Sequence, residues 1–128
     1  MIARAASPTV PSPLDHGRLR QQLADGKRTV GVFVGAASPV AAEVCAAAGA
    51  DWVLLDLEHG AGGEDQVGTV VLAAAAYGVP TVVRAESAAR IRLGRILDLG
   101  AAGIMLPPVG HGRRGPRGTA APALSAGR

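Results

Sequence analysis

Short apolar segments alternate with longer amphipathic segments along most of this chain. The apolar segments are rich in β-branched and aliphatic residues, which is typical of strands that are buried on both faces. They predict four strands, at residues 29–34, 51–57, 80–84 and 103–107. The first residues of consecutive strands are separated by 22, 29 and 23 residues. This spacing is typical of right-handed β-α-β crossovers, so we expect the strands to be parallel.

Helices are predicted before the first strand and in each of the three connections between strands. Their ranges are 14–24, 38–48, 64–77 and 88–99. The pair Ser38-Pro39 favours a helix start, because the serine hydroxyl can accept a free backbone N–H and proline fits the first turn. A glycine, which is a typical stop, follows each helix, at Gly26, Gly49, Gly78 and Gly100. The pattern as a whole predicts an α/β fold.

The chain has 128 residues, of which 48% are hydrophobic, and this is enough for the core of one domain. That domain is predicted at residues 14–109. Residues 1–13 are rich in proline and alanine and are expected to form a disordered lead. Residues 110–128 form a low-complexity tail of Gly, Arg, Pro and Ala that cannot bury enough apolar surface to fold.

The formal charge of +3 comes from the tail, because residues 1–109 hold 9 Lys and Arg against 10 Asp and Glu. The tail has four arginines but no aromatic side chain on which a base could stack, which disfavours a nucleic-acid partner. No apolar run approaches the roughly 18 residues of a membrane helix or has the form of a signal peptide. The single Cys45 cannot form an intrachain disulfide. We therefore expect a cytoplasmic protein without a membrane partner.

Candidate chemistry follows two of the predicted strands. Asp56, Glu58 and His59 come at the end of the second strand, and Arg84 ends the third. The carboxyl ends of parallel strands meet at one edge of the sheet, where α/β proteins bind their ligands. The alternative is that these residues cap the next helix and form surface ion pairs.

Six motifs occur in one register between residues 29 and 109. They are Gly-Ala-Ala-Ser-Pro at 35–39, Ala-Glu at 42–43, Ala-Gly-Ala-Asp-Trp at 48–52, Asp-Leu-Glu-His-Gly at 56–60, Val-Val-Arg at 82–84 and Ile-Leu-Asp-Leu-Gly-Ala-Ala-Gly-Ile-Met-Leu-Pro at 96–107. The series resembles the N-terminal half of the HpcH/HpaI aldolase family. This resemblance implies an incomplete TIM barrel, with about four parallel strands and three crossover helices.

The resemblance also implies a carbon–carbon lyase. Members of the family reversibly cleave 2-keto-3-deoxy or 4-hydroxy-2-oxo acids to pyruvate and an aldehyde, and they are homo-oligomers. A divalent cation, Mg²⁺, Mn²⁺ or Co²⁺, is expected to bind the 1,2-dicarbonyl edge of pyruvate in the full-length family. Together with a guanidinium, it would stabilise the enolate.

Site residues are carried over from the family position by position. Arg84 matches the arginine that holds the pyruvate oxygen, and His59 matches the histidine assigned to acid–base work. Asp56 and Glu58 match acidic residues near the metal's water shell and the aldehyde. Asp98 matches an aspartate described as the partner of that histidine. A residue at the end of a barrel helix should lie opposite the carboxyl ends of the strands, so a structural role for Asp98 stays open.

The chain departs from the family in its second half. A complete barrel has eight strands, and only four are predicted here. The family's direct metal ligands, a glutamate on the fifth strand and an aspartate after it, have no counterpart. We interpret the sequence as truncated, with residues 110–128 as a frame-shifted tail, and expect this chain to be inactive. Its open strand edges, at 29–34 and 103–107, are expected to make it self-associate.

Two other functions remain open. The chain can be a catalytically silent half-barrel, present as a fragment or an interaction module. It can also be an acyl-CoA lyase similar to the β side of citrate lyase, although Asp-Leu-Glu-His-Gly at 56–60 is the aldolase version of the motif.

Overall fold

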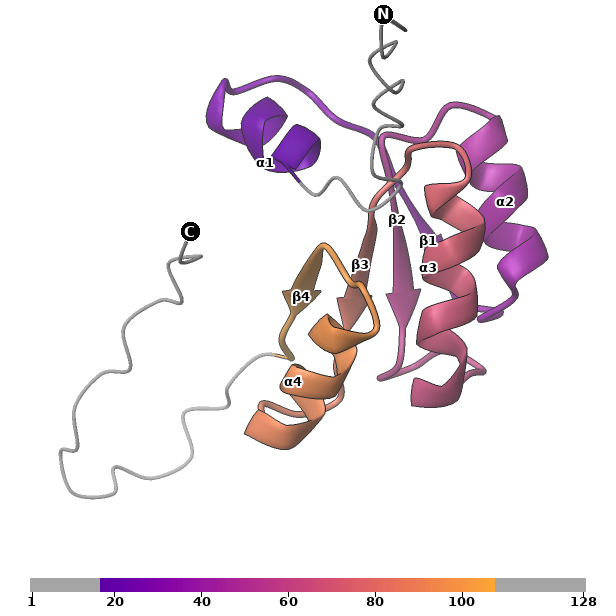
Figure 1. The fold of residues 1–128 in the computed structure, drawn as a ribbon, viewed down its shortest axis with the longest axis vertical. Helices are drawn as coiled ribbons and strands as arrows, with labels where there is room; N and C mark the ends of the chain where they lie inside the picture. Colours follow the sequence, from indigo (N-terminus) through magenta and orange to yellow (C-terminus); the bar gives the residue numbers. More distant parts are fainter. Residues whose placement is uncertain (1–16, 108–128) are drawn as a thin grey trace, which may run out of the picture.

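The computed structural model describes residues 17–107, which form a four-stranded sheet with helices packed against it (Figure 1). The elements in chain order are α1 (Gly17–Ala24), β1 (Gly31–Val34), α2 (Pro39–Ala47), β2 (Trp52–Asp56), η1 (Glu64–Gln66), α3 (Val67–Ala75), β3 (Thr81–Arg84), α4 (Arg90–Asp98) and β4 (Gly103–Met105). The predicted α/β class and the predicted alternation of strands and helices are confirmed.

All neighbouring strands are parallel, and their order in the sheet is β1-β2-β3-β4. The register pairs Val34 with Leu55 and Leu55 with Val83. One step further along, Asp56 is paired with Arg84. The carboxyl ends of the strands therefore lie at one edge of the sheet, as the crossover spacing predicts.

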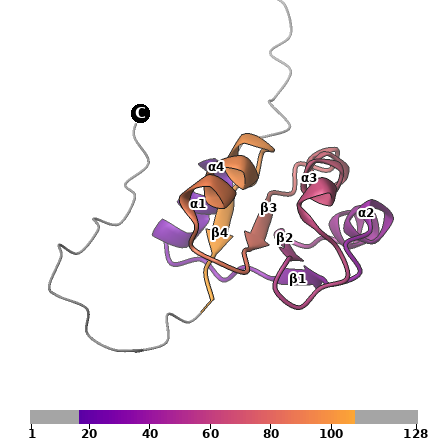
Figure 2. The same ribbon diagram turned by 90° about the horizontal axis from the view of Figure 1, so that it is seen from below.

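The hydrophobic core lies between the sheet and its crossover helices. Figure 2, which is seen from below the view of Figure 1, shows α2, α3 and α4 on one side of the strands. Alternate strand residues point toward these helices, and Val34, Leu55 and Val83 are buried there. Small side chains on the helices, such as Ala42 and Ala74, are fully buried in the same cluster. They allow the helices to pack closely on the strands.

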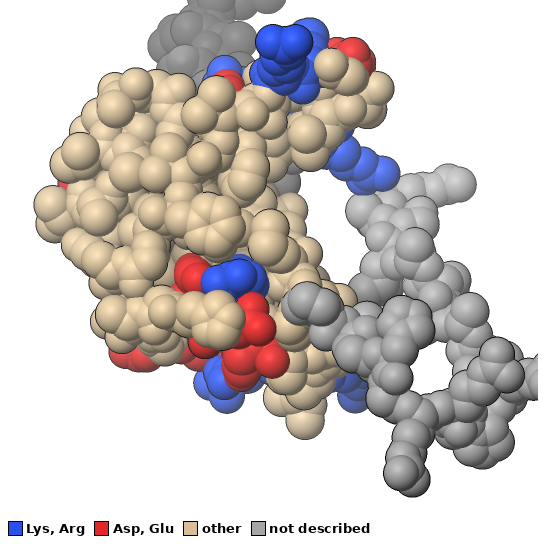
Figure 3. Space-filling model, turned by 180° about the vertical axis from the view of Figure 1, so that it is seen from behind, with Lys and Arg blue, Asp and Glu red and all other residues tan. Residues whose placement is uncertain are grey.

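None of the described crossover helices covers the opposite face of the sheet. The strand residues that alternate with the core positions lie on this face. Leu54 is fully buried there, whereas its register partner Phe33 is 55% exposed. Trp52 approaches the backbone of β1 so closely that a Cβ on Gly31 would lie 2.1 Å from its Cε2 atom. Figure 3, seen from behind, shows charged side chains near both ends of the molecule, with a broad uncharged area between them.

The predicted helix ends are confirmed by local geometry. The Ser38 hydroxyl accepts a hydrogen bond from the backbone N–H of Ala41 at 3.3 Å, and Pro39 is the first residue of α2. The four glycines predicted as helix stops have positive φ angles between 66° and 97°. They are Gly26, Gly49, Gly78 and Gly100. This left-handed conformation ends a helix and is readily adopted by glycine.

Several element boundaries differ from the prediction by one to three residues; α4 begins at Arg90 instead of residue 88, and β4 ends at Met105 instead of residue 107. β1 begins at Gly31 instead of residue 29. The Val30 carbonyl still accepts the backbone N–H of Asp51 at 2.9 Å, but the Val30 N–H donates to the Asp51 carboxylate at 2.8 Å instead of to a backbone carbonyl. The predicted helix 64–77 begins as the 3-10 turn η1, continues as α3 and ends at Ala75. The predictions for residues 1–13 and 110–128 lie outside the described residues.

Within residues 17–107, no helix has both the length and the apolar character needed to cross a membrane.

Candidate active site

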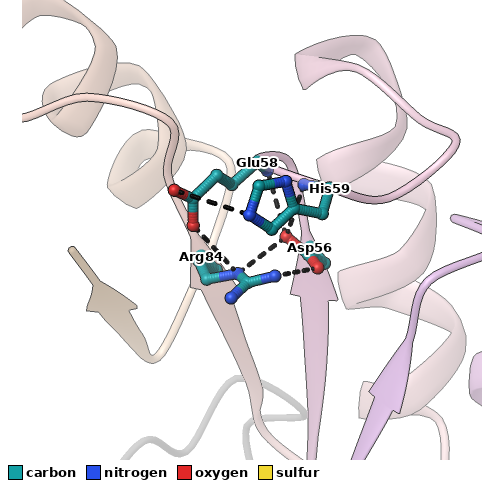
Figure 4. A network of polar contacts seen from close by, with 4 residues as sticks. All are labelled: Asp56, Glu58, His59 and Arg84. Atoms are coloured by element: carbon teal, nitrogen blue, oxygen red, sulfur yellow. Dashed lines mark hydrogen bonds and ion pairs between the residues drawn. The ribbon is translucent and has the colours of Figure 1, made fainter. Parts of the chain in front are cut away.

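The site is organised by an ion pair between the last residues of two neighbouring strands. Asp56 ends β2 and Arg84 ends β3, and the parallel register places them side by side (Figure 4). Arg84 donates from Nε to Asp56 Oδ1 at 2.8 Å and from Nη2 to Asp56 Oδ2 at 2.5 Å. This two-point geometry fixes both the position and the plane of the guanidinium.

Asp56 also holds the start of the loop that follows β2. Its Oδ1 atom accepts hydrogen bonds from the backbone N–H groups of Glu58, at 3.0 Å, and His59, at 3.1 Å. The side chain is only 7% exposed. The Arg84 hydrogen bond lowers the pKa of Asp56 from 3.8 to about 2, against the opposing effect of burial and with help from the two backbone N–H groups. The carboxylate is therefore charged throughout the neutral pH range.

Glu58 and His59 complete a connected group of four side chains, all drawn in Figure 4. Glu58 Oε2 lies 3.4 Å from Arg84 Nε, and Glu58 Oε1 lies 3.8 Å from His59 Nε2. The second contact is an ion pair only when the imidazole is protonated. The His59 side chain is 72% exposed, so it can reach a bound molecule or solvent. Asp56, Glu58, His59 and Arg84, which the sequence predicts as one site, thus lie together.

Arg84 keeps part of its guanidinium available. Its Nη1 atom has no hydrogen-bond partner among residues 17–107. The Arg84 side chain lies over the Phe33 ring of β1, with Cζ 5.7 Å from the ring centroid. The hydrogen bond to Asp56 also raises the pKa of Arg84, so this group stays cationic. The arrangement offers a fixed, partly buried positive charge to an anionic oxygen.

Phe33 is a site residue that the sequence reasoning did not select. The available signal was its position directly before Val34, which places it on the face of β1 opposite the core. An exposed aromatic side chain on that face lies in the same layer as the charged ends of β2 and β3. Its cation–π contact with Arg84 follows from this arrangement.

The loop from 57 to 63 is held closely against the β1–α2 connection. The backbone N–H of Ala61 donates to the Gly35 carbonyl at 2.8 Å. A Cβ on Gly60 would lie 2.1 Å from the Asp56 carbonyl oxygen, and a Cβ on Gly62 would lie 2.1 Å from the Ala37 Cβ. The glycines therefore permit the close approach that keeps Glu58 and His59 over the strand ends.

The fold of this chain does not bring Asp98 to the group formed by Asp56, Glu58, His59 and Arg84. It is the last residue of α4 and is exposed. The chain after it enters β4 beside the start of β3, where Ala102 N–H donates to the Thr81 carbonyl. Arg84 lies at the opposite, carboxyl end of β3. The predicted partnership of Asp98 with His59 stays a prediction.

The resemblance implies a divalent metal, but the described residues do not supply a set of direct ligands for it. Residues 17–107 contain no group of three or more His, Cys, Asp and Glu side chains that could hold a metal ion. Both oxygens of Asp56 already accept hydrogen bonds from Arg84. Glu58 is the remaining carboxylate of the group, and one carboxylate does not make a ligand set of the kind such ions prefer.

The lowered pKa of Asp56 predicts a pH-dependent stability. The unfolded chain takes up the proton first as the pH falls, so the stabilisation is complete above about pH 4 and is lost toward pH 2. It amounts to about 2.5 kcal/mol. Urea unfolding at pH 6 and pH 2.5 should show that Asp56→Asn removes most of this loss. The exposed-site control Asp65→Asn should keep the wild-type pH dependence, and equal pH dependence in Asp56→Asn and wild type would contradict the assignment.

Comparison with known proteins places this chain in a family. The model of the family described as HpcH/HpaI aldolase/citrate lyase matches residues 29–113. The hydroxypyruvate/pyruvate aldolase of Deinococcus radiodurans is 37% identical over 90 residues, which cover 70% of this chain and 32% of that protein. The 4-hydroxy-2-oxo-heptane-1,7-dioate aldolase of Salmonella dublin is 33% identical over 90 residues, with 70% and 34% covered.

A solved structure supports the same placement. The HpcH/HpaI aldolase from Desulfitobacterium hafniense superposes with a TM-score of 0.62 at 32% identity, covering 67% of this chain and 34% of that one. This chain therefore spans about a third of the length of the relatives, and its open sheet corresponds to part of their TIM barrels. On this sequence and structural similarity, the chain belongs to the HpcH/HpaI aldolase/citrate lyase family.

Proposed function

We propose that this chain supplies the Asp56–Arg84 part of a pyruvate aldolase active site. The proposed reaction is the reversible cleavage of a 4-hydroxy-2-oxo or 2-keto-3-deoxy acid to pyruvate and an aldehyde. The observation that carries the proposal is the two-point Asp56–Arg84 pair at the carboxyl edge of a parallel sheet, beside His59. The names of the relatives, hydroxypyruvate/pyruvate aldolase and 4-hydroxy-2-oxo-heptane-1,7-dioate aldolase, favour this reaction over acyl-CoA lyase chemistry.

Arg84 is suited to the oxygen that gains charge in this reaction. When the bond between C3 and C4 of the substrate breaks, its electron pair moves toward C2, and the C2 oxygen becomes an enolate oxygen. The free Nη1 of Arg84 can donate to that oxygen, while Nε and Nη2 stay bound to Asp56. A donor that is already oriented stabilises the developing charge without reorganising during the reaction.

His59 is suited to the proton transfers. Cleavage requires removal of the proton from the C4 hydroxyl as the aldehyde forms, and pyruvate forms when C3 of the enolate takes up a proton. An imidazole can carry out both steps near neutral pH. The His59 side chain is exposed, and its neighbour Glu58, 3.8 Å from Nε2, can orient the imidazole.

The whole protein would also use a divalent cation, Mg²⁺, Mn²⁺ or Co²⁺. Its direct ligands would come from outside residues 17–107, since the described carboxylates do not form a ligand set. The substrates are small 2-oxo acids and aldehydes, and the proposed compartment is the cytoplasm. The proposal assigns to residues 17–107 the guanidinium and the imidazole, and expects no activity from the 128-residue chain alone.

A chimaera tests this proposal. Residues 29–107 of this chain would replace the matching segment of the Deinococcus aldolase, and pyruvate release from a 4-hydroxy-2-oxo acid would be measured with Mg²⁺ or Mn²⁺. We expect release, and a fall in kcat of about 100-fold or more with Arg84→Lys, because a lysine cannot hold the same two-point geometry. Arg90→Lys, at an exposed position of α4, is the matched control and should leave kcat unchanged.

Two results would count against the aldolase proposal. One is a folded chimaera without activity. The other is an active chimaera in which Arg84→Lys and Arg90→Lys behave alike.

The open sheet favours a second candidate function, that of a half-barrel that binds a partner without catalysis. β1 and β4 each pair with only one described strand, so both present unpaired backbone groups. Phe33 and Met105, on the face away from the helices, are 55% and 37% exposed. We propose that two copies of the 128-residue chain associate so that these faces cover each other.

Light scattering tests this association on the 128-residue chain. We expect a mass of at least twice 12.8 kDa at micromolar concentration. Replacing Phe33 or Met105 with Asp or Lys should shift the association equilibrium toward the monomer, because a charge on the apolar face is costly to bury. A monodisperse 12.8 kDa wild-type species with a cooperative thermal transition would contradict the association.

A further inference from the structure

A second cluster of charged side chains lies outside the four-residue site. Arg92, in α4, contacts two carboxylates from different parts of the chain. Its Nε and Nη2 atoms lie 2.6 and 2.5 Å from Glu86 Oε1, and its Nη1 atom donates to Glu64 Oε2. Arg95, one turn further along α4, forms an ion pair with the other oxygen of Glu64, with Nε 2.7 Å from Oε1.

The two carboxylates stand next to the loops that carry the site. Glu64 begins η1, directly after the loop from 57 to 63 on which Glu58 and His59 lie. Glu86 follows Arg84 by two residues, in the connection between β3 and α4. Arg92 is therefore the side chain that joins the end of one site loop to the start of the other.

Burial makes the Glu64 end of this bridge the stronger one. The Glu64 side chain is 14% exposed, against 35% for Glu86 and 36% for Arg92. A hydrogen bond from the backbone N–H of Glu86, and after it the contact with Arg92, lowers the pKa of Glu86. The Glu86 carboxylate is therefore charged at neutral pH. A planar guanidinium can hold two carboxylates at once where an ammonium cannot.

We propose that Arg92 is a positioning residue for the site: by binding Glu64 and Glu86 together, it holds the 57–63 loop at a fixed place relative to Arg84. In this role Arg92 acts through Glu64 and Glu86, its two ion-pair partners, and not on the substrate. The loop contains three glycines, so its backbone has many alternative conformations when unrestrained. Asp56 fixes the start of the loop through two backbone N–H groups, and Arg92 fixes its end through Glu64.

This inference deepens the proposed function and is tested without substrate. Amide hydrogen exchange of the 128-residue chain reports the loop through the N–H groups of His59, bound to Asp56, and Ala61, bound to Gly35. We expect Arg92→Gln to speed exchange at both by about fivefold, the size expected for a partly exposed ion pair. Exchange at Leu55, inside the sheet, should not change.

Two further variants separate positioning from general stability. Glu86→Gln removes the other end of the bridge at a partly exposed side chain, and it should reproduce the effect of Arg92→Gln on the loop. Arg95→Gln removes a partner of Glu64 but leaves the bridge between the loops, so it should change loop exchange by less than about twofold. High salt should reduce the difference between wild type and Arg92→Gln.

The inference is overturned if Arg92→Gln and Glu86→Gln leave exchange at His59 and Ala61 unchanged. It is also overturned if Arg95→Gln accelerates the loop as much, or if exchange at Leu55 rises in step with the loop. Each of these results leaves the aldolase proposal untouched, because that proposal depends on pyruvate release. An inactive chimaera, in turn, leaves the exchange result valid as a property of this chain.

Discussion

The rest of the site depends on the buried ion pair between Asp56 and Arg84. A charge at the edge of a core is costly without a partner, and here each charge is neutralised by the other through two hydrogen bonds. The parallel register of β2 and β3 brings the two residues opposite each other, so the pair is a direct consequence of the sheet. The same Asp56 carboxylate accepts the N–H groups of Glu58 and His59. The pair thus links sheet register to loop position and to the direction of the free guanidinium nitrogen.

The Asp56–Arg84 pair sets what residues 17–107 would contribute to the proposed aldolase reaction. They place a cation whose pKa is raised and an exposed imidazole at the carboxyl edge of the sheet. Both carboxylate oxygens of Asp56 accept hydrogen bonds from Arg84, so Asp56 orients the guanidinium and does not bind a ligand itself. The chain spans about a third of its relatives' length, and the described part carries the guanidinium and the imidazole of the proposed site without a metal ligand set. Tight loop packing at Gly60 and Gly62 then keeps these groups in place.

Much of the fold follows from local sequence signals. Apolar runs separated by crossover-length segments predicted four parallel strands, and Ser38 with Pro39 predicted a helix start that the structure confirms. The meeting of Asp56 and Arg84 at one edge followed from parallel strands. Their two-point hydrogen bonding did not, because it depends on a one-residue match in register and on the rotamer of a long side chain. A shift by one residue would have placed Arg84 on the other face.

The contacts that sequence reasoning missed join residues that are distant along the chain. The Arg92 bridge to Glu64 spans 28 positions and depends on how α4 packs beside η1. Phe33 lies under Arg84 because three strands pair side by side, and its alternation with Val34 indicates only its face of the sheet, not this contact. The prediction for Asp98 rests on family resemblance alone, and its place at the end of α4 offers no local support. Propensity and periodicity describe elements well, but side-chain contacts between elements require the tertiary arrangement.

The central claim is that Arg84 holds Asp56 in its charged, loop-binding state. The most direct measurement is the pKa of the Asp56 carboxyl group, followed by carbon NMR in the wild type and in Arg84→Gln. The account predicts a value of about 2 in the wild type and a clear rise in the variant, because the guanidinium hydrogen bond that lowers this pKa most is then absent and burial is opposed only by the two backbone N–H groups. An Asp56 pKa that is the same in both proteins would contradict it.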